Sequence, residues 1–103
     1  MTPRAGVAEL FISRRAEQEL RGIWRDISAE SPAAADRLLL KIDKRLQVLR
    51  DFPNMGTLRA DIRPSFRMLV EGNYLLLYEY DEANDAVELI AVVDGRQDLT
   101  ELF

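Results

Sequence analysis

Hydrophobic residues recur along the chain with two different periods, and these periods predict its secondary structure. Residues 7–13 are mostly apolar and partly β-branched, which is typical of a strand. After Ser13, which is suited to cap a helix, apolar residues recur at helical spacing up to Ile27. A second helix is predicted from about Pro32 to Asp51. The helical stripes consist of Ala16, Leu20, Ile23, Trp24 and Ile27 in the first helix and of Ala35, Leu38, Leu39, Ile42, Leu46 and Leu49 in the second.

The second half of the chain predicts strands. The segment Asp51–Gly56 ends the second helix with Pro, Asn and Gly, and the stretch up to Pro64 is expected to be an ordered loop. Three strands follow, over residues 65–71, 74–80 and 86–93, and short polar turns join them. The middle strand is apolar on both faces for most of its length, so we expect it at the centre of the sheet.

This order, β-α-α-β-β-β, predicts an α+β fold in which a helical hairpin packs on one face of an antiparallel-dominated sheet. The join between the helices is too short for anything but an antiparallel hairpin. A length of 103 residues is sufficient for a single domain, residues 1–103. Because two helices cover only one face, we expect much of the other face to lie open. A partner is expected to add a helix to a groove or a strand to a free edge.

Composition excludes several classes of chemistry. The chain has no Cys and no His, so disulfides, Cys-ligated zinc and His-dependent triads are impossible. We predict no metal and no cofactor. The net charge is −4, with +4 in residues 1–67 and −8 in residues 68–103, where Arg96 is the one basic residue. An acidic protein is poorly suited to a phosphate backbone, so we expect a protein partner rather than nucleic acid.

The sequence also predicts a cytoplasmic protein. No apolar run approaches the roughly 20 residues that span a bilayer. Glu9 interrupts the first apolar segment, and a signal peptide requires an uninterrupted one. We therefore expect neither secretion nor membrane association.

Five short motifs, in order along residues 8–103, resemble those of one family. They are Ile23-Trp24 followed by Ile27, Ser31-Pro32-Ala33-Ala34-Ala35-Asp36-Arg37-Leu38, Phe52-Pro53-Asn54-Met55-Gly56, Asn73-Tyr74-Leu75-Leu76-Leu77-Tyr78, and Asp94-Gly95-Arg96-Gln97-Asp98-Leu99. They are similar to the "IW…I", "NPAAADRL", "FPxMG", "RYLIFY" and "HGRxDL" motifs of the ParE/RelE superfamily of toxins from type II toxin–antitoxin systems. In the last motif, Asp94 stands where the family commonly has His.

The resemblance implies one of two activities. ParE-like members inhibit DNA gyrase by stoichiometric binding and are neutralised by a ParD-like antitoxin, with which they form a hetero-oligomer. RelE-like members are ribosome-dependent mRNA endonucleases. They carry an Arg at the position that matches Leu75 and a Tyr or equivalent in the closing segment. This chain has no tyrosine after Tyr80. The resemblance therefore favours a gyrase inhibitor that is not an enzyme, and leaves the endonuclease or a non-toxic antitoxin-binding remnant as alternatives.

Two groups of residues are candidates for binding. The apolar residues of the closing segment either dock on the domain or wait for a partner, and we expect them to bind the target. Trp24 is expected either to pack in the core or to contact a partner. The arginines Arg59, Arg63 and Arg67 are expected either to lie on a solvated, salt-bridged surface or to contact an acidic partner. The predicted target-binding residues are Arg96, Asp98, Leu99, Leu102 and Phe103, and the predicted antitoxin-binding residues are Trp24, Arg59, Arg63 and Arg67.

Overall fold

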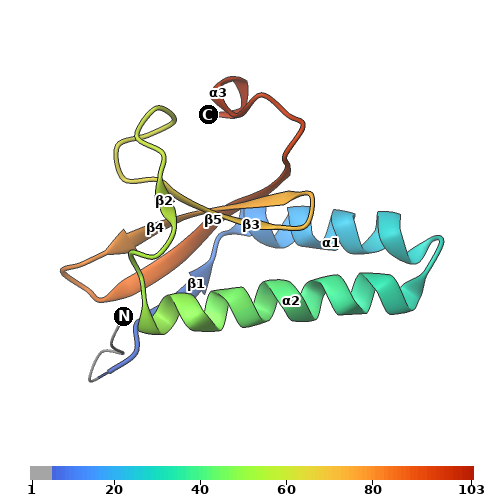
Figure 1. The fold of residues 1–103 in the computed structure, drawn as a ribbon, viewed down its shortest axis with the longest axis horizontal. Helices are drawn as coiled ribbons and strands as arrows, with labels where there is room; N and C mark the ends of the chain where they lie inside the picture. Colours follow the sequence, from blue (N-terminus) through green and yellow to red (C-terminus); the bar gives the residue numbers. More distant parts are fainter. Residues whose placement is uncertain (1–5) are drawn as a thin grey trace.

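The computed structural model describes residues 6–103 and confirms the predicted α+β architecture. The elements in chain order are β1 (Glu9–Ile12), α1 (Arg14–Ser28), α2 (Pro32–Asp51), β2 (Thr57–Leu58), β3 (Arg67–Glu71), β4 (Tyr74–Asp81), β5 (Ala86–Asp94) and α3 (Leu99–Leu102). Within the described residues the strands form one sheet of order β1-β5-β4-β3-β2 (Figure 1). β1 runs parallel to β5, and the other pairs are antiparallel.

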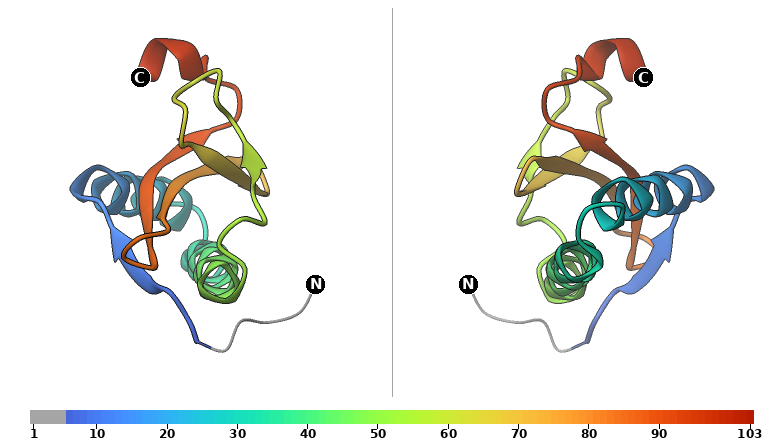
Figure 2. Two further views of the ribbon diagram at one scale, coloured as in Figure 1. Left: turned by 90° about the vertical axis from the view of Figure 1, so that its left-hand side faces the viewer. Right: turned by 90° about the vertical axis from the view of Figure 1, so that its right-hand side faces the viewer.

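α1 and α2 form the predicted hairpin and cover one face of the sheet (Figure 2). Ser31 caps α2, with its side chain accepting from the Ala34 N–H, and Pro32 occupies the first turn. The core between helices and sheet is built from apolar residues of both layers. Its largest fully buried side chains are Tyr78, Ile42, Leu49, Leu76, Leu89, Val87 and Val92.

The expectation that the opposite face of the sheet lies open is wrong for much of that face. A second apolar cluster covers it, in which Leu77, Ala91 and Val93 of the sheet pack with Leu99 of α3. The β2–β3 connection contributes Ile62 to the same cluster. Figure 2 shows α3 and this connection on the side of the sheet away from α1 and α2. The closing segment therefore docks on the domain.

Two short elements are absent from the sequence prediction. β2 has two residues and lies within the stretch expected to be a loop, and α3 has four residues within the expected tail. Neither is long enough to display an apolar period. The prediction also begins the first strand at residue 7, whereas β1 begins at Glu9.

A β-bulge in β5 allows the sheet to bury apolar side chains on both faces. Leu77 of β4 pairs with Ala91, but the next residue, Tyr78, pairs with Leu89, so Ile90 is the extra residue. As a result, Leu89 lies in the helix-side cluster while Ile90 and Ala91 both lie in the opposite one. Simple alternation along β5 does not give this arrangement.

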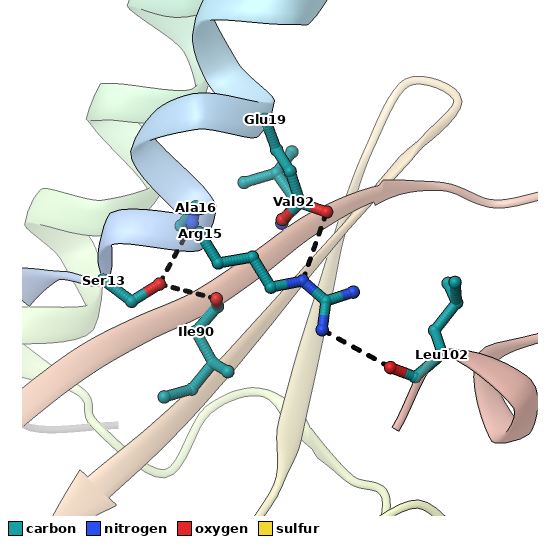
Figure 3. Close-up of polar contacts among 7 residues, drawn as sticks. All are labelled: Ser13, Arg15, Ala16, Glu19, Ile90, Val92 and Leu102. Carbon is teal, nitrogen blue, oxygen red and sulfur yellow. Dashed lines mark hydrogen bonds and ion pairs between the residues drawn. The ribbon is translucent and has the colours of Figure 1, made fainter.

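Ser13 joins β1, α1 and β5 at this bulge (Figure 3). Its N–H donates to the Leu89 carbonyl at 2.9 Å, which ends the pairing of β1 with β5. Its Oγ accepts from the Ala16 N–H at 3.0 Å and so caps α1. The same hydroxyl donates to the Ile90 carbonyl at 2.7 Å. One side chain thus fixes the start of α1 relative to β5.

The break after α2 is locked by Tyr78. The Tyr78 hydroxyl donates to the Pro53 carbonyl at 2.8 Å and accepts from the Gly56 N–H at 2.9 Å. A Cβ at Gly56 would lie 2.7 Å from the Tyr78 ring, so this close approach requires glycine. Burial raises the pKa of the Tyr78 phenol. These contacts give Tyr78 a role in packing.

No helix within residues 6–103 is long and apolar enough to cross a membrane.

The two capping serines offer a matched test of the Ser13 contacts. We expect Ser31→Ala to lower the free energy of unfolding by about 1 kcal/mol, the usual cost of losing a helix cap. Ser13→Ala should cost about 1–3 kcal/mol more, because it also leaves the Ile90 carbonyl without its partner. Urea unfolding of both variants measures the difference. Equal destabilisation would show that the bond to Ile90 contributes nothing to stability.

Candidate functional site

An apolar groove lies between α1 and α2 on the outer surface of the helical hairpin. Its volume is about 550 Å³. Leu20 and Trp24 line it from α1, Leu39 from α2 and Ile12 from the end of β1. The helical spacing of Leu20 and Trp24 brings both side chains to the edge of the apolar stripe that faces α2. The groove is therefore an extension of the helix–helix interface that remains open to solvent.

Trp24 belongs to this groove and not to the core beneath the helices. The residue is 37% exposed, and its Nε1 donates to Asp36 Oδ1 of α2 at 3.0 Å. This bond holds the indole across the two helices. An aromatic side chain that keeps an apolar face open while its polar atom is satisfied is typical of a binding surface.

The groove continues into the free edge of β1. The Glu9 N–H donates to the Asp85 carbonyl just before β5, and the Ser13 N–H donates to Leu89 of β5. The backbone groups of the alternate residues, Leu10 and Ile12, therefore point away from β5, towards the open edge of the sheet. The residues Phe11 and Ile12 are 51% and 44% exposed. An exposed strand edge beside an apolar groove can accept both a strand and a helix.

Charged residues border the groove. Glu17 and Arg21 form an ion pair one helical turn apart, and Arg25 has no ion pair within residues 6–103. The lining carries one carboxylate and two guanidinium groups, and the Asp36 carboxylate lies beside it, bonded to Trp24, so the positive and negative charges balance. Arg25 is the cation of this border with which a carboxylate of a partner can pair.

The predicted target-binding residues all lie in or next to α3, but they differ in accessibility. Leu99 is buried at 7% exposure, and Leu102 and Phe103 are half-buried against the second apolar cluster. Asp98 caps α3 by accepting from the Thr100 hydroxyl at 2.7 Å and from the Thr100 N–H at 3.0 Å, and these two bonds, the hydroxyl's above all, lower the pKa of its carboxyl group. Leu99 thus anchors the segment, and its neighbours form the surface.

Arg96 is held by Asp94. Its Nε and Nη2 lie 3.0 and 2.8 Å from the two carboxylate oxygens, and the Arg96 N–H donates to the same carboxylate at 2.9 Å. This fork of hydrogen bonds lowers the pKa of Asp94 to about 2 and raises that of Arg96. The arginine side chain is 89% exposed, but its hydrogen bonds to Asp94 fix its orientation in solvent.

The predicted antitoxin-binding residues do not form one surface. Trp24 lies on α1, whereas the arginines lie in or near β2 and β3, at the other end of the sheet order. Arg59 forms two hydrogen bonds with Asp61, at 2.9 and 2.8 Å, and these raise its pKa. Arg67 donates to two backbone carbonyls, and Arg63 lies 5.8 Å above the Phe66 ring. Arg59 and Arg67 therefore stabilise the β2–β3 region.

The sequence does not predict three residues that contact α3 or hold a residue that does. Arg15 and Glu19 of α1 look like an ordinary exposed helix face, yet both are half-buried and contact the opposite end of the chain or β5. Phe66 looks like an alternating strand residue, yet it packs edge-on against Phe103 at 5.2 Å. Nothing in local spacing signals contacts over more than 35 residues. Among the described residues, no group of His, Cys, Asp and Glu is placed to hold a metal ion.

Comparison with known proteins gives one family and two informative structures. A model of the ParE toxin of type II toxin–antitoxin systems, parDE, matches residues 10–99. The chromosomal ParDE system from P. aeruginosa is similar in structure, with a TM-score of 0.71 and 16% identity over 85% of this chain and 96% of that chain. The toxin–antitoxin complex RelBE2 from Mycobacterium tuberculosis has a TM-score of 0.64 and 17% identity over 90% and 97%. No curated protein matches the sequence.

These findings confirm the resemblance drawn from the motifs. The two structures establish only the fold, because sequence identities of 16% and 17% are too low to indicate a shared function. The family match is independent of them and spans most of the chain. The chain therefore belongs to the ParE toxin family of type II toxin–antitoxin systems.

Proposed function

We propose that this protein inhibits DNA gyrase by stoichiometric binding and is neutralised by a ParD-like antitoxin. The observation that carries the proposal is the match of residues 10–99 to the ParE toxin model. The structural likeness to both ParDE and RelBE2 does not discriminate, because one fold serves several functions. The choice between gyrase inhibition and mRNA cleavage therefore depends on the residues.

The state of the candidate catalytic groups supports inhibition without turnover. Cleavage of RNA needs a general base, a general acid and a free cation close together. Here Arg96 is bound to Asp94 and Arg59 to Asp61, while Tyr78 is fully buried and bonded to the backbone. Ion-paired and buried groups of this kind are suited to holding a surface in shape.

We place the antitoxin on the groove between α1 and α2 and on the β1 edge. An amphipathic antitoxin helix would cover Leu20, Trp24 and Leu39, and a following strand would pair with Leu10 and Ile12. The target then contacts the other side of the molecule, at Arg96 and the segment around α3. This assignment leaves Trp24 in the antitoxin site and moves Arg59 and Arg67 out of it.

A plasmid supercoiling assay with purified gyrase and ATP tests the proposed activity. Increasing amounts of the protein should inhibit supercoiling and leave cleaved, protein-linked plasmid, and a ParD-type antitoxin should reverse both effects. Unchanged supercoiling by a folded protein that arrests growth would refute gyrase as the target and make ribosome-dependent mRNA cleavage the next assay. Normal growth on overexpression without antitoxin would indicate a non-toxic, antitoxin-binding remnant.

The groove assignment predicts a binding hot spot at Trp24. Trp24→Ala should weaken the complex with a ParD-type antitoxin at least tenfold, in the range of about 2 kcal/mol typical of buried aromatic anchors. Leu58→Ala, which removes a 52% exposed apolar side chain from β2, should leave the affinity unchanged. Titration calorimetry measures both. Because Trp24 is the one tryptophan in the chain, its fluorescence should also shift to shorter wavelength on binding. Equal affinities of the two variants would place the antitoxin elsewhere.

The Asp94–Arg96 pair predicts a specific acid titration. The pKa of Asp94 should be about 2 in the folded protein and should return towards 3.8 in Arg96→Gln. The folded-state pKa is below the unfolded value, so the pair stabilises the fold above pH 3.8 and this contribution is lost as the pH falls through 2. Carboxyl carbon NMR measures the pKa. Asp98, whose pKa is lowered by Thr100, is the internal control and should not move.

A further inference from the structure

The segment around α3, residues 98–103, depends on contacts with the rest of the protein. α3 has four residues, and a helix this short has no stability of its own in water. Leu99 anchors one end in the second apolar cluster. The other end, at Leu102 and Phe103, is half-buried and needs further contacts to hold one position.

Those contacts come from Arg15 of α1. Its guanidinium carbon lies 4.3 Å from the centroid of the Phe103 ring, and its Nη1 donates to the Leu102 carbonyl at 3.4 Å. The Phe103 ring also packs edge-on against Phe66, with 5.2 Å between the ring centroids, and Arg63 lies over Phe66. The four side chains form a row in which two arginines flank two phenylalanines.

Arg15 is itself fixed by the sheet. Its Nε donates to Glu19 Oε2 at 3.4 Å, and Glu19 Oε1 accepts from the Val92 N–H at 2.9 Å. Figure 3 shows this path from β5 through Glu19 and Arg15 to Leu102. A guanidinium group has the planar fork of donors that lets one side chain stack on a ring and donate in two directions. A lysine can place a charge on the ring, but it lacks that fork.

We propose that Arg15 is a positioning residue that holds residues 98–103 in the orientation in which they meet the target. The proposal rests on the proposed function only for the role of this segment in target contact. Arg15 faces away from the groove that we assign to the antitoxin, which Glu17 and Arg21 border on the same helix. Its substitution should therefore affect toxicity and leave antitoxin binding unchanged.

The test compares Arg15→Gln and Arg15→Lys with Arg14→Gln, a neighbouring exposed arginine outside these contacts. Backbone ¹⁵N relaxation should give order parameters near 0.85 for Leu102 and Phe103 in the wild type and below about 0.6 in Arg15→Gln, while the anchored Leu99 stays rigid in both. Arg15→Lys should lie between them, because it retains a cation above Phe103. Arg14→Gln should match the wild type. A closing segment as rigid in Arg15→Gln as in the wild type would overturn the proposal.

Potency is measured as growth arrest on induced expression and as inhibition of gyrase. Arg15→Gln should need about fivefold more protein for the same effect, the factor expected for loss of a cation–π contact, with partial rescue in Arg15→Lys and unchanged antitoxin affinity. A loosened segment with full growth arrest would overturn the proposal. Growth arrest that depends on Arg15 without gyrase inhibition would support it and refute the proposed target instead.

Discussion

The part of β5 that extends past the end of β1 has an unpaired backbone edge, and this edge constrains the rest of the structure. β5 has nine residues, but β1 pairs only with its first four, Ala86–Leu89. The Ile90 carbonyl and the Val92 N–H then point towards α1, and a buried backbone group left unpaired costs about 1–3 kcal/mol. Ser13 donates to the first and Glu19 accepts from the second. α1 therefore replaces the missing strand, and its height along β5 is fixed by two side chains.

This placement gives α1 a different task on each side. On one side, Leu20 and Trp24 line the groove with α2. On the other, Arg15 contacts Phe103 and Leu102. The bulge at Ile90 contributes to the same division, because it directs Leu89 towards the helices and Ala91 towards α3. The surfaces that we assign to antitoxin and target are thus held by one helix, although they lie on opposite sides of it.

The sequence is sufficient to predict what depends on local pattern and insufficient for contacts between distant residues. Helix caps at Ser13 and Ser31, the break at Pro53 and the hairpins of the sheet all follow from residue type and spacing. The bulge does not follow from residue type and spacing, because Ile90 and Ala91 are equally compatible with a strand whose side chains alternate regularly between the two faces. The covered second face was missed because an apolar closing segment reads equally well as docked or free.

The candidate site shows the same limit. The bond between Arg96 and Asp94 joins residues two apart in the chain, so residue type and spacing can indicate it, whereas target binding by Arg96 stays a prediction. Trp24 and the three arginines lie on separate surfaces, and the sequence cannot show this, because linear charge density gives no information on which sheet edge a residue occupies. Helical spacing places Trp24 on the apolar stripe, but its position at the open border of that stripe depends on where α2 lies.

The pairing of the arginines bears on the class of target. Affinity for a phosphate backbone comes largely from cations that exchange counterions for phosphates, and it requires several of them free on one surface. Arg15 and Arg96 near α3 and Arg59 after β2 are each bound to a carboxylate, and Arg63 lies over the Phe66 ring. Asp98 and Glu101 add exposed negative charge. A nucleic acid would have to break these pairs to gain its own contacts. A protein can instead meet both members of each pair and pack on Leu102 and Phe103, which favours a protein target over RNA.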